Sequence, residues 1–110
     1  MIVNLAVNAL QAMPGGGRLT LRIEEIEGFC TFTVEDTGVG MTPEVLDRIF
    51  IPFFTTKDEG RGTGLGLPVV HGIVTSRGGT ITVQSRVGAG SRFVVRLPLS
   101  VSNPHGEDTP

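Results

Sequence analysis

The chain has 110 residues, a length that suits a single domain with one hydrophobic core. Its hydrophobic fraction of 39% and charged fraction of 18% are ordinary for a globular chain, and no apolar run is long enough to cross a bilayer. A formal net charge of −2 argues against nucleic-acid binding as the main activity, and a lone cysteine excludes an internal disulfide and a thiolate zinc site. We therefore expect one cytoplasmic domain with no nucleic-acid partner.

The first third of the chain predicts a helix followed by a β-hairpin. Residues 2–13 carry apolar side chains at helical spacing and stop before a Pro-Gly-Gly-Gly run. Residues 18–26 and 29–36 each alternate apolar and polar side chains, and Glu27-Gly28 between them favours a tight antiparallel turn. Cys30 lies on the apolar side of its strand, so we expect it to pack in the core. The predicted apolar stripe of the helix consists of Ile2, Leu5, Ala6, Ala9, Leu10 and Met13.

The rest of the chain predicts a short helix, a longer helix and a second hairpin. Thr42 followed by Pro43 is typical of a helix start, and Gly78-Gly79 is typical of a helix end. The predicted ranges are 43 to about 49 and about 65–77 for the helices, 80–85 and 91–98 for the strands, 52–64 and 86–90 for connections, and 100–110 for a flexible tail. The two strands place five apolar side chains on one face, namely Ile81, Val83, Phe93, Val95 and Leu97.

Helices that interrupt a set of antiparallel strands indicate an α+β fold. We expect a two-layer α/β sandwich in which helices cover one face of a mostly antiparallel, mixed sheet. This order of elements argues against the dinucleotide fingerprint that the glycines of EGRGTGLGLPVVHGIV, residues 59–74, suggest in isolation. Such a fingerprint needs a strand directly before its glycines and a parallel strand after its helix, whereas here a loop precedes and a hairpin follows.

Two polar features could serve a phosphate-bearing ligand. Asn4, Asn8 and Gln11 lie opposite the apolar stripe of the first helix, and an asparagine carbonyl can join the oxygen shell of Mg²⁺. The alternative for these amides is a solvated polar face. Asp36 ends a strand ahead of two glycines, and an ionised carboxylate suits the exocyclic amine of adenine. The alternative for this segment is an ordinary turn.

Four sequence blocks in a fixed order resemble a known family. NLAVNALQA, DTGVG, IFIPFFTTK and GTGLGL resemble the N, G1, F and G2 boxes of histidine kinase catalytic domains. These domains have the Bergerat fold, a nucleotide-binding fold that they share with DNA gyrase B and MutL. The resemblance extends from residue 2 to residue 99, and four boxes in order with these spacings are very specific.

The resemblance implies that the domain binds Mg-ATP, and it assigns roles to individual residues. Asn8 would be the Mg²⁺ ligand that bridges the metal to the ATP phosphates, and Asp36 would bind the adenine amine. Ser91 stands where the family has a threonine that helps this aspartate hold adenine through water, and serine keeps the hydroxyl. Gly38 and Gly40 would shape the pocket around the base. The other ATP-binding candidates are Met41, Phe54, Lys57, Thr63, Gly64, Leu65, Gly66 and Leu67.

Residues 50 to about 66 correspond to the ATP lid of this family, which rearranges as nucleotide enters and leaves. Phe53 and Phe54 would anchor the lid against the body of the domain. Lys57 would reach phosphate, with a solvated lysine as the alternative. The segment from Gly64 to Gly66 would direct backbone amides at the start of the longer helix toward the phosphates.

The catalytic candidates are Asn4, Asn8 and Lys57, and Asn4 carries the sharpest expectation. Hydrolytic members of the superfamily have a glutamate at the Asn4 position, where it acts as general base on the attacking water. An amide cannot take up a proton at neutral pH, so we expect slow hydrolysis and transfer of the γ-phosphoryl group to another nucleophile. The resemblance therefore implies a protein histidine kinase, in which positioning and charge neutralisation carry catalysis.

In this family the phosphoacceptor is a histidine on a separate dimerisation domain, from which the phosphoryl group passes to the receiver domain of a response regulator. Neither His71 nor His105 has the sequence context of such an acceptor. The family's domain also begins upstream of this chain, so we expect residues 1–99 to be a catalytic domain without its first strands. Its sheet edge would be open, which predicts a monomer or weak association. The whole protein would be a homodimer and could be anchored in a membrane.

Two alternatives remain open on the sequence. An anti-sigma-type serine kinase shares the fold and the boxes, although FFTTK followed closely by GTGLGL favours the sensor kinases. A nucleotide-sensing module without transfer activity would bind ATP with the same residues. Both alternatives predict ATP binding, so only the fate of the γ-phosphoryl group distinguishes them from a histidine kinase.

Overall fold

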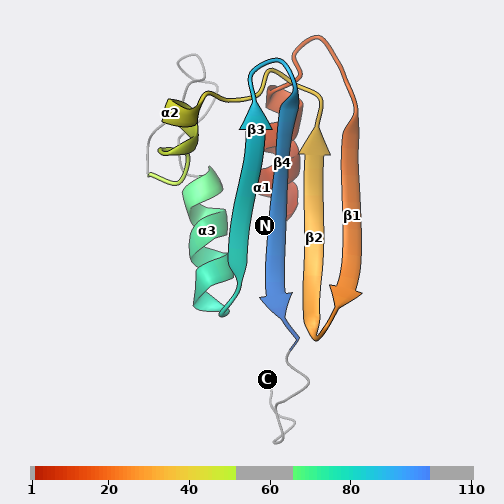
Figure 1. Ribbon diagram of the computed structural model, residues 1–110, viewed down its shortest axis with the longest axis vertical. Coiled ribbons are helices and arrows are strands. Elements are labelled where there is room, and N and C mark those ends of the chain that lie inside the picture. The colour runs from red at the N-terminus through yellow and green to blue at the C-terminus, as the bar shows by residue number, and fades with distance from the viewer. Residues whose placement is uncertain (1, 52–65, 100–110) are drawn as a thin grey trace, which may run out of the picture.

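The computed structural model describes residues 2–51 and 66–99. Over these residues the strands form one sheet in the order β1-β2-β4-β3, and each neighbouring pair is antiparallel, so no parallel pair occurs among them. Figure 1 shows the sheet in front of α1, with α3 beside β3. The elements are α1 (Ile2–Gln11), β1 (Leu19–Ile26), β2 (Phe29–Asp36), α2 (Pro43–Leu46), α3 (Gly66–Ser76), β3 (Thr80–Arg86) and β4 (Gly90–Pro98).

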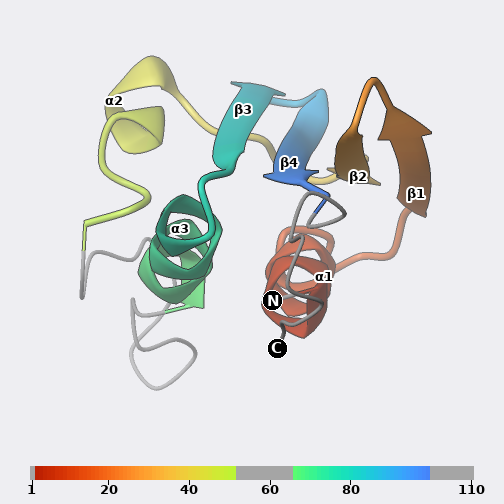
Figure 2. The same ribbon diagram turned by 90° about the horizontal axis from the view of Figure 1, so that it is seen from below.

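The two layers of the domain are the sheet and the pair α1 and α3, which lie on one of its faces (Figure 2). This confirms the predicted α+β fold with helices on one face of a sheet. Cys30 packs against the core from β2, as its place in the alternation predicts. The buried core combines residues from both helices, the inner strands and the turn after α2, namely Leu5, Ala9, Phe32, Val34, Ile49, Val70, Val74, Phe93 and Val95.

Both predicted hairpins form, and their turns explain where the glycines stand. Glu27 and Gly28 have φ values of 50° and 84°, so a two-residue turn with both central residues in the left-handed region joins β1 to β2. Because β4 pairs with both β2 and β3, the second hairpin lies beside β2, with β4 inside the sheet and β3 at its edge. The C-terminal end of β2 therefore lies next to the turn between β3 and β4.

The helix ends follow their predicted signals, with two corrections. The first is that α1 ends at Gln11 and not at residue 13. Gly79 N–H donates to the Val74 carbonyl at 2.9 Å and Gly78 N–H to that of Thr75 at 3.0 Å, which closes α3 in a Schellman motif. Thr42 Oγ1 accepts from Val45 N–H at 3.2 Å and caps α2 as predicted. However, α2 ends at Leu46 and not near residue 49, because the hydrogen bonds that follow span three residues and form tight turns.

The apolar stripe expected for α1 was drawn too wide. Leu5, Ala9 and Met13 are buried, but Leu10 is 56% exposed, because α1 presents a different arc of its surface to α3 and β2. Leu21 and Ile23 of β1 are also more than half exposed, although they lie on the face of the sheet that α1 and α3 cover farther along. No described helix is long and apolar enough to cross a bilayer.

Candidate functional site

Asp36 is buried at the C-terminal end of β2, with only 4% of its surface exposed. One carboxylate oxygen, Oδ1, accepts a hydrogen bond of 2.8 Å from Gly38 N–H, so the residue does begin a turn. The other oxygen has no protein partner within residues 2–51 and 66–99. A buried carboxylate with an open acceptor position is costly unless a donor reaches it, so this end of β2 is the strongest candidate for a ligand contact.

Ser91 lies directly opposite Asp36 across the β2–β4 ladder and is 7% exposed. The pair therefore shares one face of the sheet with the buried pair Val34 and Phe93, because alternate residues of a strand face the same side. The structure thus brings together the two residues that the sequence predicts to hold adenine. The ion pair between Arg92 and Glu35, at 3.1 Å, lies on the opposite, outward face and is exposed.

The loop after Asp36 is held between α1 and the β3–β4 turn. Val39 N–H donates to the Ala12 carbonyl at 2.9 Å, and the Val39 carbonyl accepts from Gly88 N–H at 2.8 Å. Thr37 Oγ1 accepts from Arg18 N–H at 2.9 Å, which ties the start of the loop to the entry of β1. These bonds fix the backbone beside the open carboxylate oxygen from three directions.

The glycines of this loop are required by packing inside the protein. A Cβ at Gly38 would collide with the carbonyl group of Ala12. Gly40 has a φ of +73°, and a Cβ there would collide with the carbonyl of Arg86. The two glycines let the loop pack closely against α1 and the β3–β4 turn, a structural role that the sequence did not predict. Gly66, by contrast, faces open space at the start of α3.

Asn4 and Asn8 lie one helical turn apart on α1 and are both half-buried. The expectation that they point fully away from the core is therefore wrong. They flank the buried arc of the helix, and its most exposed arc carries Val3 and Leu10. This placement weakens the alternative of a simple solvated face for the two asparagines.

The start of α3 and the start of the F box also lie close together. Leu67 packs against the core, and the ring of Phe50 lies 4.9 Å from that of His71. Figure 1 shows α2 and the first turn of α3 on the side of the sheet where β3 ends. The remaining predicted lid and tail residues lie outside the described residues, namely Phe53, Phe54, Lys57, Thr63, Gly64, Leu65 and His105.

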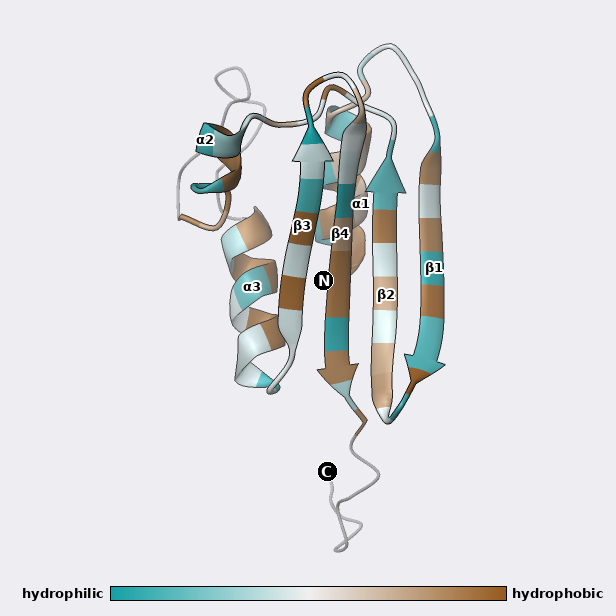
Figure 3. Ribbon diagram, viewed as in Figure 1, coloured by the Kyte–Doolittle hydropathy of each residue, from teal (hydrophilic) through white to brown (hydrophobic). Residues whose placement is uncertain are grey.

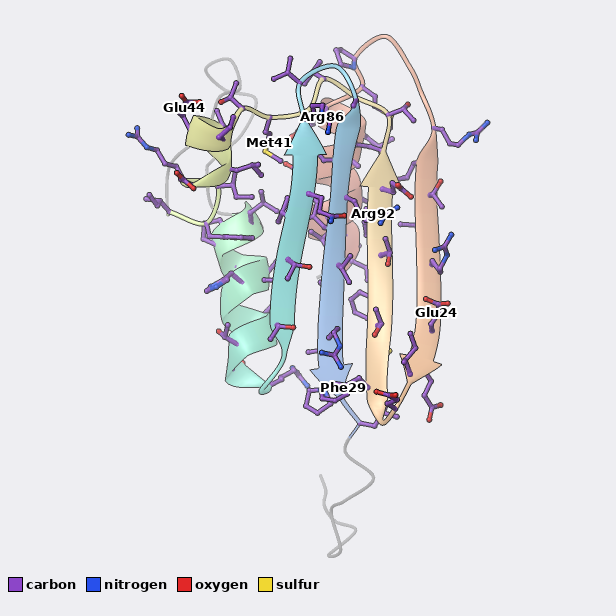
Figure 4. The ribbon with its side chains drawn as sticks, viewed as in Figure 1. Glu24, Phe29, Met41, Glu44, Arg86 and Arg92 are labelled. Carbon is purple, nitrogen blue, oxygen red and sulfur yellow. The ribbon has the colours of Figure 1, made fainter. Side chains whose placement is uncertain are left out.

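Two residues at this end of the sheet have contacts that the sequence did not predict. Met41 N–H donates to Ser85 Oγ at 2.8 Å, and Figure 4 shows Met41 near the end of β3, where Arg86 also lies. Ser85 follows Ile81 and Val83 on the inward face of β3. A polar residue in this apolar series was a signal in the sequence that could have identified Ser85 as a candidate. Its partners become visible only once the strands are paired.

A protein-family model described as histidine kinase-, DNA gyrase B-, and HSP90-like ATPase matches residues 1–101. Together with the α+β fold, this match defines the chain as a catalytic domain of the kind found in sensor histidine kinases. The chain belongs to the histidine kinase-, DNA gyrase B-, and HSP90-like ATPase family.

Proteins of similar sequence include sensor kinases. The chain is 45% identical over 123 residues to sensor kinase CckA of Brucella abortus. The aligned region covers 98% of this chain and 13% of that protein. It is 44% identical over 108 residues to sensor histidine kinase ZraS of Escherichia coli. Here the aligned region covers 96% of this chain and 23% of that protein. The chain thus spans only a small part of the length of these relatives.

Two solved structures have the same fold as this chain over most of its length. Full-length ShkA in complex with AMPPNP matches with a TM-score of 0.77 and 34% identity over 88% of this chain and 20% of that one. The catalytic domain of histidine kinase ThkA matches with a TM-score of 0.76 and 33% identity over 88% of this chain and 62% of that one.

Proposed function

We propose that this domain binds Mg-ATP and donates the γ-phosphoryl group to a histidine on a separate dimerisation domain, for relay to the receiver domain of a response regulator. The observation that carries the nucleotide assignment is the buried carboxylate of Asp36 with its open oxygen. An ionised carboxylate accepts the exocyclic amine of adenine and disfavours the carbonyl that guanine presents at the same place. The complex of ShkA with AMPPNP, an analogue of ATP, supports the assignment by likeness.

The residues of α1 fit a Mg²⁺ ion that is held jointly with the nucleotide. Asn8 offers a hard amide oxygen from a half-buried position, and no cluster of three or more acidic, histidine or cysteine side chains occurs in the part of the chain that the structure describes. Mg²⁺ commonly takes one or two protein oxygens and completes its shell with water and phosphate, which agrees with a single amide ligand. When bound, the ion would neutralise charge on the phosphates.

Within this proposal the protein orients the phosphoryl group, and the Asn4 position offers no base for water. Asn4 lies one turn before Asn8, and its amide cannot take up a proton from a water molecule. The backbone N–H groups of Gly66 and Leu67 at the start of α3 would meet the phosphates at the positive end of the helix dipole. These features favour slow hydrolysis and delivery of the phosphoryl group to a positioned nucleophile.

A labelling experiment tests the proposal directly. The domain is mixed with a purified dimerisation domain from a related sensor kinase and with γ-labelled ATP. Acid-labile, base-stable label on the dimerisation domain is the expected result, with little inorganic phosphate released when the acceptor is left out. Acid-stable label on a serine of a partner protein would favour an anti-sigma-type kinase. ATP binding without label on any acceptor would leave a nucleotide-sensing module.

A further inference from the structure

Three polar residues form a row across the end of the sheet on its helix-covered face. Ser91 on β4 lies opposite Asp36 on β2 and, on its other side, opposite Ser85 on β3. The row sits directly above apolar layers of the core, the nearest of which contains Val34, Phe93 and Val83. Of its three members, Ser85 is the one to which neither the sequence nor the proposed function gives a role.

The hydroxyl of Ser85 is the meeting point of three contacts. It accepts from Met41 N–H at 2.8 Å, lies 3.0 Å from the Gly90 carbonyl oxygen and lies 2.8 Å from Ser91 Oγ. A hydroxyl has one proton to donate, so the proton of Ser85 has two possible acceptors. Ser85 donates either to the Gly90 carbonyl or to Ser91.

The carbonyl of Gly90 decides between the two arrangements. Gly90 is buried at the start of β4, with a φ of +84°. This carbonyl oxygen can only accept, whereas Ser91 can also donate, so all three contacts of Ser85 become hydrogen bonds only when Ser85 donates to Gly90. Ser91 must then donate its own proton to Ser85, because Ser85 has none left for it. The oxygen of Ser91 consequently remains as an acceptor next to Asp36.

We propose that Ser85 is a positioning residue of the adenine pocket. It ties the loop at Met41 to the β3–β4 turn, and it draws the proton of Ser91 away from the ligand. This end of the sheet then presents two acceptors, the Asp36 carboxylate and the Ser91 oxygen, to the adenine amine and an accompanying water. This inference rests on the proposed function, because it assumes that a purine base contacts Asp36.

Base selection follows from the direction of that proton. When the proton of Ser91 is engaged by Ser85, no hydroxyl donor in the row can satisfy the carbonyl oxygen of guanine. Removing the Ser85 hydroxyl frees the proton of Ser91, which can then donate toward that carbonyl. Loss of Ser85 is therefore expected to reduce discrimination between ATP and GTP, in addition to loosening the loop.

The test compares Ser85→Ala, Ser85→Thr and the control Ser76→Ala, whose hydroxyl bonds to the Ile73 carbonyl on the exposed side of α3. Affinities for ATP and GTP are measured by calorimetry, and amide hydrogen exchange is measured by NMR in the nucleotide-free protein. We expect Ser85→Ala to speed exchange at Met41, to weaken ATP binding about fivefold and to lower the ratio of ATP to GTP affinity about as much. Ser85→Thr should restore both within about twofold, and Ser76→Ala should change neither.

Three results are decisive against parts of the proposal. Equal losses of ATP and GTP affinity in Ser85→Ala would overturn the role in base selection, since a purely structural residue would behave in that way. Unchanged exchange at Met41 would overturn the role in holding the loop. If the unmodified protein binds neither nucleotide, the proposed function fails, and exchange at Met41 still decides whether Ser85 anchors the loop.

Discussion

Asp36 combines two roles that the sequence leaves as alternatives. One carboxylate oxygen holds the turn through Gly38 N–H, and the other is free of protein partners among the described residues. A turn-forming aspartate and a ligand-binding aspartate are therefore compatible in one side chain. A substitution that keeps the hydrogen bond of the turn and changes only the other oxygen can therefore test the ligand contact by itself.

Asp36→Asn should preserve the fold and weaken nucleotide binding. The amide oxygen can still accept from Gly38 N–H, while the loss of charge and the new NH₂ donor disfavour the adenine amine. We expect ATP affinity to fall roughly tenfold to a hundredfold, as for the loss of a hydrogen bond to a charged group, with a smaller loss for GTP. Calorimetric titration with both nucleotides checks this, and Asp47→Asn on the exposed turn after α2 is the control. Unchanged ATP affinity in Asp36→Asn would refute the base contact.

Asn8→Ala separates metal-dependent binding from base binding. Removing the amide oxygen should weaken ATP binding about tenfold when Mg²⁺ is present and by less than about twofold when a chelator removes it. Val3→Ala, at a position of the same helix that is 71% exposed, is the control and should change neither affinity. Equal losses with and without Mg²⁺ would show that Asn8 acts through the fold and not through the metal.

At the scale of elements, the loop between β2 and α2 is shaped by the elements on either side of it. Its backbone bonds to Ala12 at the end of α1 and to Gly88 in the β3–β4 turn. The glycine pattern of DTGVG could be recognised in the sequence, but its physical cause could not. The two carbonyl groups that forbid a side chain come from segments far away along the chain.

Gly40→Ala should therefore destabilise the domain, whereas Gly72→Ala should not. A φ of +73° and the collision with the Arg86 carbonyl predict a loss of at least about 1–3 kcal/mol in the free energy of unfolding for Gly40→Ala. Gly72 lies in α3 with open space around it, so alanine there should stabilise the domain by roughly 0.5–1 kcal/mol. Urea denaturation of the two variants measures both effects. Similar stabilities in both variants would contradict the tight packing of the loop.

At the scale of the whole molecule, the helix layer covers only the start of β1 and leaves the rest of that strand exposed. Figure 3 shows apolar bands on β1 at the edge of the sheet, and Ile23 is 66% exposed there. Leu21 and Ile23 pair with the buried Val34 and Phe32, so they face the same side, but no described element covers them. Charged Arg22 and Glu24 on the same strand limit pairing of this edge with other chains.

This uncovered strand predicts weak self-association of the chain. Ile23→Lys should lower the apparent mass at high protein concentration, because it places a charge on the exposed apolar edge. Thr82→Lys, at an exposed position of β3 on the other face, is the control and should leave association unchanged. Sedimentation analysis over a concentration series measures the difference. A monomer at every concentration before any substitution would refute the prediction.

The sequence by itself determined the elements and the family, because helix periodicity, strand alternation, turn glycines and the four boxes are all local patterns. The family resemblance also assigned roles to Asp36, which begins DTGVG, and to Ser91, which lies outside the four boxes. Only the tertiary structure decided that Ser85 joins them, because β4 lies between β2 and β3 and the register sets the three side chains in one row. The exposure of β1 was likewise decided there, since burial depends on where α1 crosses the sheet and not on the alternation of the strand.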